Sequence, residues 1–327
     1  MGNAANQPVE RSVQLAGNTT FVVSLPKSWA LEQGLEPGAS MHLYPHRDRV
    51  VVAPASLESS ERQVAIDAGA MNADVVCHRV RAAYAAGADR IVVSDHDGLE
   101  RDLRRRVTRL FAGLVGMDVS EETPERLVAN DFLDAADVSL PQTTAQLRQH
   151  ARSMFDDAIE AVLTDDEALA ARVTDRTDDV DRLVAFVSRG FHRGLEDITE
   201  IDRLDVDRAS AFHSYQIARG LERLADHAER IATIADRQSG PPTVAPALEA
   251  VAADALTVVE LALEGSPDRA LSMQSRVVSS IESLDRQLSS ECDPNTYLHG
   301  SVLERVRRTA ALGVSLTGPA IETGGQQ

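Results

Sequence analysis

Carboxylates at helical spacing are the side chains of this sequence that most directly suggest chemistry. In the segment 217–234, apolar residues recur every three or four positions and predict an amphipathic helix. Glu222 and Asp226 are four positions apart on another face of that helix. Asp178 and Asp181, on the helix predicted before it, also lie off the apolar stripe. If the two helices are neighbours, these carboxylates converge at one surface groove.

Such a set of oxygen ligands suits a hard divalent or trivalent cation, with Mg²⁺, Mn²⁺, Ca²⁺ or iron as candidates. The alternative is a solvated acidic surface. The chain has 51 Asp and Glu against 33 Lys and Arg, a formal net charge of -18, and Lys27 is its single lysine. We expect a halophilic protein, because molar salt screens charge repulsion within about 3 Å. Spacing alone leaves both interpretations open.

The helical part of the sequence contains an internal repeat. Residues 178–182 (DDVDR) resemble residues 282–286 (ESLDR), and residues 221–224 (LERL) resemble residues 303–306 (LERV). This similarity predicts two related three-helix bundles in tandem. We place the first at 141–240 and the second at 241–322.

The second repeat departs from the first at a candidate ligand. Aligning Glu304 with Glu222 puts Arg308 where Asp226 stands. A guanidinium replaces a cation ligand with a like charge. We therefore predict that the second site is degenerate and that Asp285 and Glu304 pair with Arg308 instead.

Two further domains are predicted before the helical part, so the fold class is multidomain. Residues 1–54 predict a small β-rich domain with two hairpins around one short helix. Residues 58–138 alternate strands and helices and predict a small α/β middle unit. The remainder is all-α, in the tandem three-helix bundles described above.

One helix of the α/β unit carries the most basic stretch of the chain. Its arginines could contact phosphate or an acidic partner, or could line an exposed face paired with Glu100 and Asp102. The stretch comprises Arg101, Arg104, Arg105, Arg106 and Arg109.

Several classes of protein are disfavoured by the sequence. No apolar run approaches the ~18 residues that a membrane span needs, and the first residues lack the features of a signal peptide. Cys77 and Cys292 are too few for a disulfide framework. No histidine follows a glutamate at the spacing of di-metal carboxylate enzymes, and neither a phosphate-binding glycine loop nor a nucleophile elbow is present. We expect a cytoplasmic protein that is not an enzyme.

Two segments resemble known families. The N-terminal segment resembles the archaeal form of the AbrB/SpoVT swapped-hairpin domain, in GNTT at residues 17–20 and VVSLPKSW at residues 22–29. LERLADHA at residues 221–228 is similar to the signature of the phosphate-uptake regulator (PhoU) family. This order of domains is that of archaeal regulators, in which the N-terminal domain is a swapped-hairpin dimer.

The resemblance implies a regulator of phosphate uptake and phosphate homeostasis. It implies a homodimer that acts on a subunit of the phosphate ABC transporter or its signalling partners, with metal bound at the first-repeat carboxylates. The alternative is an AbrB-type transcription factor for phosphate-responsive genes. In that case DNA is contacted through the N-terminal domain, by Arg11, Lys27, Arg47 and Arg49. Those four are balanced by Glu10, Glu32, Glu36 and Asp48, so the domain has no basic footprint.

Overall fold

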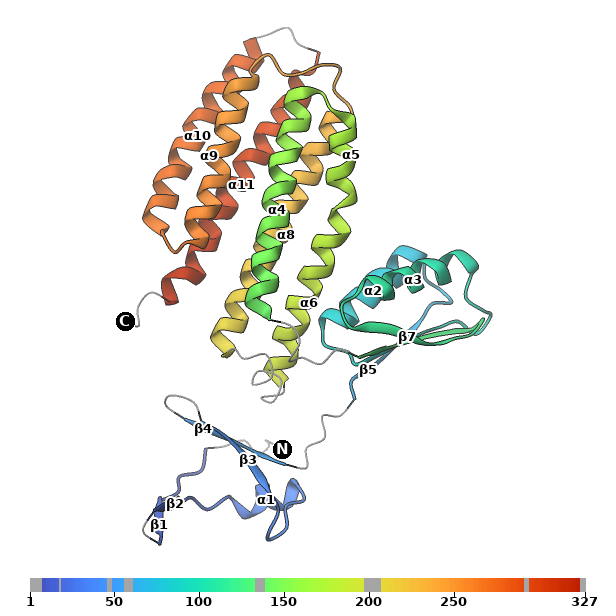
Figure 1. The fold of residues 1–327 in the computed structure, drawn as a ribbon, viewed down its shortest axis with the longest axis vertical. Helices are drawn as coiled ribbons and strands as arrows, with labels where there is room; N and C mark the ends of the chain where they lie inside the picture. The colour runs from blue at the N-terminus through green and yellow to red at the C-terminus, as the bar shows by residue number, and fades with distance from the viewer. Residues whose placement is uncertain are drawn as a thin grey trace. The chain divides into compact units, whose positions relative to one another are not determined.

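The computed structural model describes residues 8–17, 19–45, 49–55, 61–132, 139–196, 207–290 and 294–323. The chain divides into two compact units, residues 1–60 and 61–327 (Figure 1). A β-rich N-terminal region precedes a mostly helical C-terminal part, which confirms the predicted multidomain class at that level. The four domain boundaries proposed above stay predictions. No helix among the described residues is long and apolar enough to span a membrane.

The N-terminal unit has almost no interior of its own. Two antiparallel hairpins, β1 with β2 and β3 with β4, flank the short helix α1. Among the described residues of this unit only Pro54 is buried, and the Phe21 side chain is 75% exposed. The elements are β1 (Gln14–Ala16), β2 (Thr20–Val22), α1 (Lys27–Glu32), β3 (Met41–Pro45) and β4 (Val50–Pro54).

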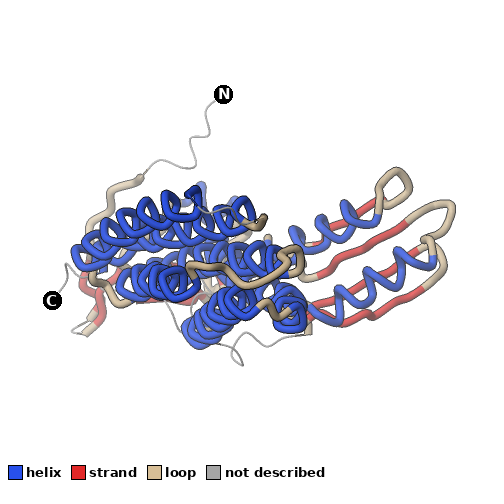
Figure 2. Tube along the Cα trace, turned by 90° about the horizontal axis from the view of Figure 1, so that it is seen from above, coloured by secondary structure: helices blue, strands red, loops and turns tan. Residues whose placement is uncertain are grey.

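The second unit begins with a four-stranded sheet in the order β5-β6-β8-β7. β5 and β6 are parallel, as expected of strands joined by a helix, and the other pairs are antiparallel. Helices α2 and α3 cover one face of this sheet (Figure 1, Figure 2). The elements are β5 (Gln63–Asp67), α2 (Ala73–Ala85), β6 (Arg90–Ser94), α3 (Arg101–Gly113), β7 (Met117–Glu122) and β8 (Arg126–Asp131).

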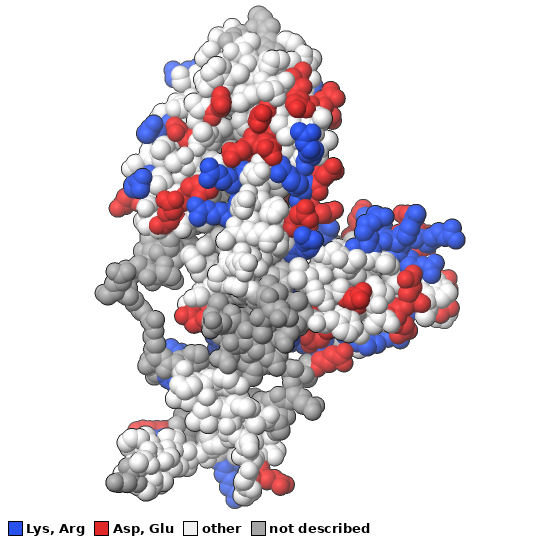
Figure 3. Space-filling view, in the orientation of Figure 1, with Lys and Arg blue, Asp and Glu red and all other residues white. Residues whose placement is uncertain are grey.

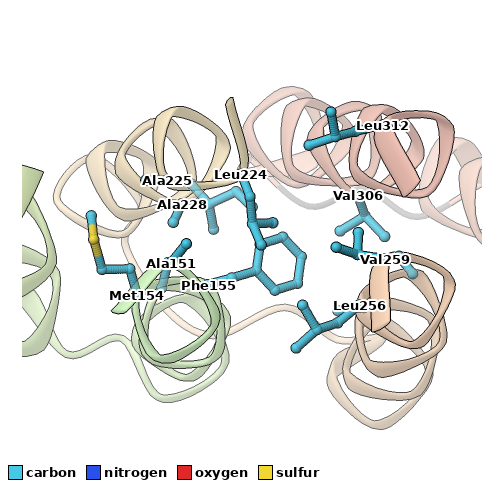
Figure 4. Packing of buried hydrophobic residues seen from close by; sticks show 14 of the residues in the cluster. Ala151, Met154, Phe155, Leu224, Ala225, Ala228, Leu256, Val259, Val306 and Leu312 are labelled. Atoms are coloured by element: carbon cyan, nitrogen blue, oxygen red, sulfur yellow. The ribbon is translucent and has the colours of Figure 1, made fainter. Parts of the chain in front are cut away.

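The helical part forms one continuous apolar core. α8 packs against α4 and α6, the last three helices pack against one another, and α8 also packs on α11. Phe155 of α4 lies among Leu224, Leu256, Val259 and other apolar side chains from both halves (Figure 4). The helices are α4 (Leu140–Thr164), α5 (Glu167–Asp175), α6 (Thr177–Glu196), α8 (Arg208–Ala235), α9 (Ala245–Leu263), α10 (Pro267–Ser290) and α11 (Thr296–Thr323).

α6 joins the helical core to the α/β part of the unit. Val184 on one side of α6 is buried in the helical core, whereas Ala185 belongs to the core of the sheet and its two helices. Arg189, one helical turn further, is buried and donates hydrogen bonds to the carbonyl oxygens of Tyr84 (3.2 Å) and Ala88 (2.7 Å). It also forms an ion pair with Asp131 at the end of β8.

A close approach between α9 and α11 requires glycine at position 313. A Cβ atom there would lie 2.8 Å from Cγ1 of Val258 and 2.8 Å from the backbone nitrogen of Val259. Both distances are shorter than packed atoms tolerate, and one of the two neighbours is backbone. Gly300, near the start of the same helix, has no atom within 4 Å of the corresponding position.

These two glycines therefore predict opposite effects of the same substitution. Gly313→Ala must push α9 and α11 apart, so we expect its free energy of unfolding to fall by about 1–3 kcal/mol despite the better helix propensity of alanine. Gly300→Ala gains that propensity without a clash and should be stabilised by roughly 0.5–1 kcal/mol. Guanidinium denaturation of the full chain measures both. Equal changes in the two variants would contradict the packing described here.

Candidate functional site

The predicted carboxylates lie on the faces of α6 and α8 that point away from the helical core. On α6, Val180 is buried, which leaves the Asp178 side chain 87% exposed and that of Asp181 34% exposed. On α8, burial of Leu224 leaves Asp226 exposed and Glu222 half-buried. The helical periodicity accounts for both arrangements.

The structure brings the carboxylates of the two helices within electrostatic range of one another. Burial raises the pKa of the Asp181 carboxyl; the nearby cation Arg81 opposes this, and the charges of Asp178, Asp226 and Glu229 raise it further. Burial also raises the pKa of Glu222; Arg219 opposes it, and Asp181 and Asp226 add to it. We call Asp178, Asp181, Glu222, Asp226 and Glu229 the carboxylate cluster.

Two arginines form ion pairs with carboxylates of the cluster. Arg81 of α2 places Nη2 3.1 Å from Oδ1 of Asp178 and Nη1 3.8 Å from Oδ2 of Asp181. On α8, Arg219 forms an ion pair with Glu222 three residues along the same helix. Sequence reasoning missed Arg81, because it precedes Asp178 by 97 residues and belongs to the α/β part.

The donor chemistry and the charge of the cluster fit a hard cation, but the side chains are not gathered around one point. Within the described part of the chain, no three His, Cys, Asp or Glu side chains are close enough to hold a metal ion. The raised pKa values of Asp181 and Glu222 report repulsion and desolvation that a bound cation would relieve. Metal binding at the cluster stays a prediction.

Of the two acidic residues predicted to pair with Arg308, Glu304 does so, whereas no pair with Asp285 is present among the described residues. Nε of Arg308 lies 2.9 Å from Oε1 of Glu304, and Nε of Arg307 lies 3.8 Å from Oε2 of the same residue. The loss of a cation site in this repeat stays a prediction.

His227 of α8 does not face the carboxylate cluster. Its Nδ1 lies 3.0 Å from the hydroxyl oxygen of Thr309 on α11, and the ring is half-buried. Burial, together with nearby arginines, lowers the pKa of His227 to about 4. A neutral imidazole at this helix contact is a packing group.

The arginines of α3 pair more widely than the sequence predicts. Arg105 forms the local pair with Asp102 at 3.0 Å, but Arg106 pairs with Asp74 of α2 and Arg104 approaches Glu122 of β7 at 4.0 Å. No pair with Glu100 is present among the described residues. Figure 3 shows the resulting concentration of basic side chains over α2 and α3.

The basic residues predicted to contact DNA come from separate parts of the N-terminal unit. Arg11 precedes β1, Lys27 begins α1 and Arg49 precedes β4, and all three are exposed. Arg47 lies outside the described residues. Contact with DNA stays a prediction.

Comparison with known families matches residues 144–235 to the PhoU domain. The match runs from α4 to the end of α8 and includes all five residues of the carboxylate cluster. It supports a PhoU-type protein. No curated protein matches the chain.

The raised pKa of Asp181 predicts a stability effect of known sign. A carboxyl whose pKa is higher in the folded state stabilises the fold below its unfolded pKa, and this stability is lost as pH rises through the folded value. At pH 7 without divalent cations, the Asp181→Asn variant, which has a neutral side chain at this position, should therefore be more stable than the unaltered chain. The gain should be at most about 1 kcal/mol, because the Asp181 carboxyl is partly solvated.

Thermal unfolding at pH 7 and pH 4 measures this difference, which should shrink at pH 4. The control is Asp285→Asn, which removes an exposed carboxylate of α10 outside the cluster. It should leave the unfolding midpoint unchanged at both pH values. A loss of stability in Asp181→Asn at pH 7 would mean that the contact with Arg81 outweighs burial and repulsion.

Proposed function

We propose, on the basis of the PhoU domain at residues 144–235, that this chain is a cytoplasmic regulator of phosphate uptake that acts by protein contact and not as an enzyme. PhoU domains are typical of phosphate-uptake regulators. The single observation that carries the proposal is that the domain match contains the whole carboxylate cluster. The target that fits best is a subunit of the phosphate ABC transporter or a signalling partner of it.

A divalent or trivalent cation at Asp178, Asp181, Glu222 and Asp226 is the second part of the proposal. Its support is the raised pKa of Asp181 and Glu222, since a nearby positive charge favours the ionised forms of both. A bound cation would supply positive charge and open coordination positions on an otherwise acidic helix face. A partner carboxylate or phosphate could then dock there.

Dimerisation through the N-terminal unit is the third part. Its apolar side chains are exposed to an extent that an independent domain does not tolerate, and a unit of about 60 residues is marginal even with a core. The exposed set comprises Val13, Leu15, Phe21, Val22, Val23, Leu25, Leu31, Leu43 and Val50. A second copy of the same unit, as in a swapped-hairpin dimer, would cover these surfaces symmetrically.

Regulation through DNA is the second candidate function, and the resemblance of residues 1–54 to AbrB/SpoVT domains favours it. Arg11, Lys27 and Arg49 are exposed at the surface of the N-terminal unit. The net charge of -18 opposes DNA binding. Non-specific affinity for DNA depends on basic side chains that neutralise phosphates, and an acidic chain repels them.

A polar substitution in the exposed apolar set should dissociate the dimer. We expect Phe21→Asp in the full chain, and deletion of residues 1–54, to reduce the mass measured by light scattering in molar salt from dimer to monomer. Leu195→Asp is the matched control, because Leu195 is 53% exposed but belongs to α6. A dimer that survives deletion of residues 1–54 would place the main contact elsewhere.

Neutralising the cluster should abolish both cation binding and the control of uptake. We expect Asp181→Asn with Asp226→Asn to lower bound metal in elemental analysis at least tenfold, and to release phosphate uptake from control in cells. Asp285→Asn with Glu304→Gln, from the second repeat, should change neither.

A variant of the N-terminal unit, Arg11→Ala with Lys27→Ala, separates the two candidate functions. Under the protein-contact proposal, uptake control survives these substitutions. If control is lost in this variant while the cluster variant retains it, and a promoter fragment is released in a salt-dependent way, DNA binding is the function instead.

A further inference from the structure

A pocket of about 500 Å³ lies between α2, α3 and α6, at the junction of the α/β part with the PhoU domain. Its volume is within the roughly 300–1,000 Å³ range of small-molecule sites. It overlaps the carboxylate cluster at Asp178 and Asp181, which line it, but does not include Glu222, Asp226 or Glu229. Neither the domain match nor the proposed function assigns a role to it.

Guanidinium groups from all three helices line the pocket, and three of the four form ion pairs with aspartates of the same lining. Arg81 comes from α2, Arg106 and Arg109 from α3, and Arg182 from α6. Arg109 is exposed, and the described residues offer it no ion pair or hydrogen bond. An unpaired guanidinium at the mouth of a pocket is the group that a phosphate most readily engages, through bidentate charge-assisted hydrogen bonds.

The rest of the lining combines acidic and apolar residues with His78 and Cys77 of α2. Asp178, Asp179 and Asp181 of α6 provide carboxylate oxygens, which accept hydrogen bonds from hydroxyl and amino groups. The apolar part is Leu110, Gly113 and Leu114 of α3 with Ala185 of α6. A Cβ atom on Gly113 would meet nothing within 4 Å, so space is open directly above it.

We infer that this pocket binds a nucleoside phosphate. Such a ligand has the three features that the lining requires: an anionic phosphate for the arginines, ribose hydroxyls for the aspartates, and a flat base for the apolar surface. Inorganic phosphate or polyphosphate has only the first. With four arginines and four aspartates in the lining, a purely anionic ligand gains little net attraction.

Occupation of the pocket would act on the carboxylate cluster through Arg81. This guanidinium contacts Asp178 and Asp181, and a ligand phosphate would compete with them for it. Because the two sites share Asp178 and Asp181 as well as Arg81, ligand binding would change the affinity for the cation, and cation binding would change the affinity for the ligand by the same factor. This consequence rests on the proposed function, whereas the binding of a nucleoside phosphate does not.

The direct test is isothermal titration calorimetry of the full chain with AMP, ATP, adenosine and inorganic phosphate. We expect AMP or ATP to bind, and adenosine and inorganic phosphate to bind at least tenfold more weakly. Arg109→Gln should weaken binding about tenfold or more, the loss expected for a hydrogen bond to a charged group. Arg101→Gln is the matched control on the same helix and should bind normally, because Arg101 does not line the pocket.

Gly113→Leu tests the location of the site without damaging the fold. Leucine would fill the open space above residue 113 and has a better helix propensity than glycine. We expect this variant to lose nucleotide binding while its unfolding midpoint stays unchanged or rises. Retained affinity in Gly113→Leu would overturn the assignment to this pocket.

Cys77 lines the pocket and gives a second readout. In a Cys292→Ser chain it is the only thiol, and AMP or ATP should slow its alkylation by maleimide. Arg109→Gln should remove this protection. Equal affinity for inorganic phosphate and AMP, or no binding of AMP and ATP in either assay, would overturn the inference. Both assays are run in metal-free buffer and need no measurement of uptake in cells, so failure of the proposed function would be recognised separately.

Discussion

The buried ion-pair network around Arg189 fixes the position of the α/β part on the helical bundle. Nη1 of Arg193 lies 2.8 Å from Oδ1 of Asp89 and 3.0 Å from Oδ2 of Asp131, and Asp131 also pairs with Arg189. The Arg189 guanidinium stacks over the Tyr84 ring at 4.9 Å. Removing one partner of such a buried pair typically costs roughly 3–5 kcal/mol. These contacts hold α6 against the sheet and its helices, and the contact of Arg81 with the carboxylate cluster lies between the same parts.

In an acidic chain that has one lysine, arginine is the internal counterion. Arginines of α2 and α3 reach carboxylates of other elements, as Arg106 does with Asp74 and Arg81 with Asp178. Burial, together with the neighbouring carboxylates, nevertheless raises the pKa of Asp181 and Glu222 against the effect of Arg81 and Arg219. A surface that repels its own charges in the folded state is destabilised locally, and such a surface is suited to a charged ligand or partner.

The two compact units differ in how completely they fold within one chain. The unit of residues 61–327 buries Tyr84, Phe111 and Phe155 almost completely, in two large apolar clusters. The N-terminal unit forms its hairpins by local hydrogen bonds and leaves Phe21 and Leu43 exposed. Local pairing is enough to define its secondary structure without burying its apolar surface.

Periodicity in the sequence determined the elements and the faces of the helices. The spacing of apolar residues placed Glu222 with Asp226, and Asp178 with Asp181, away from the core, and the repeat alignment predicted the pair of Glu304 with Arg308. These relations span a few residues of one helix, where geometry follows from 3.6 residues per turn. Only the tertiary structure decided that α6 and α8 bring their carboxylates together, that His227 faces α11, and that Arg81 meets Asp178 across 97 residues. Contacts of that separation depend on how whole elements pack, which no local pattern encodes.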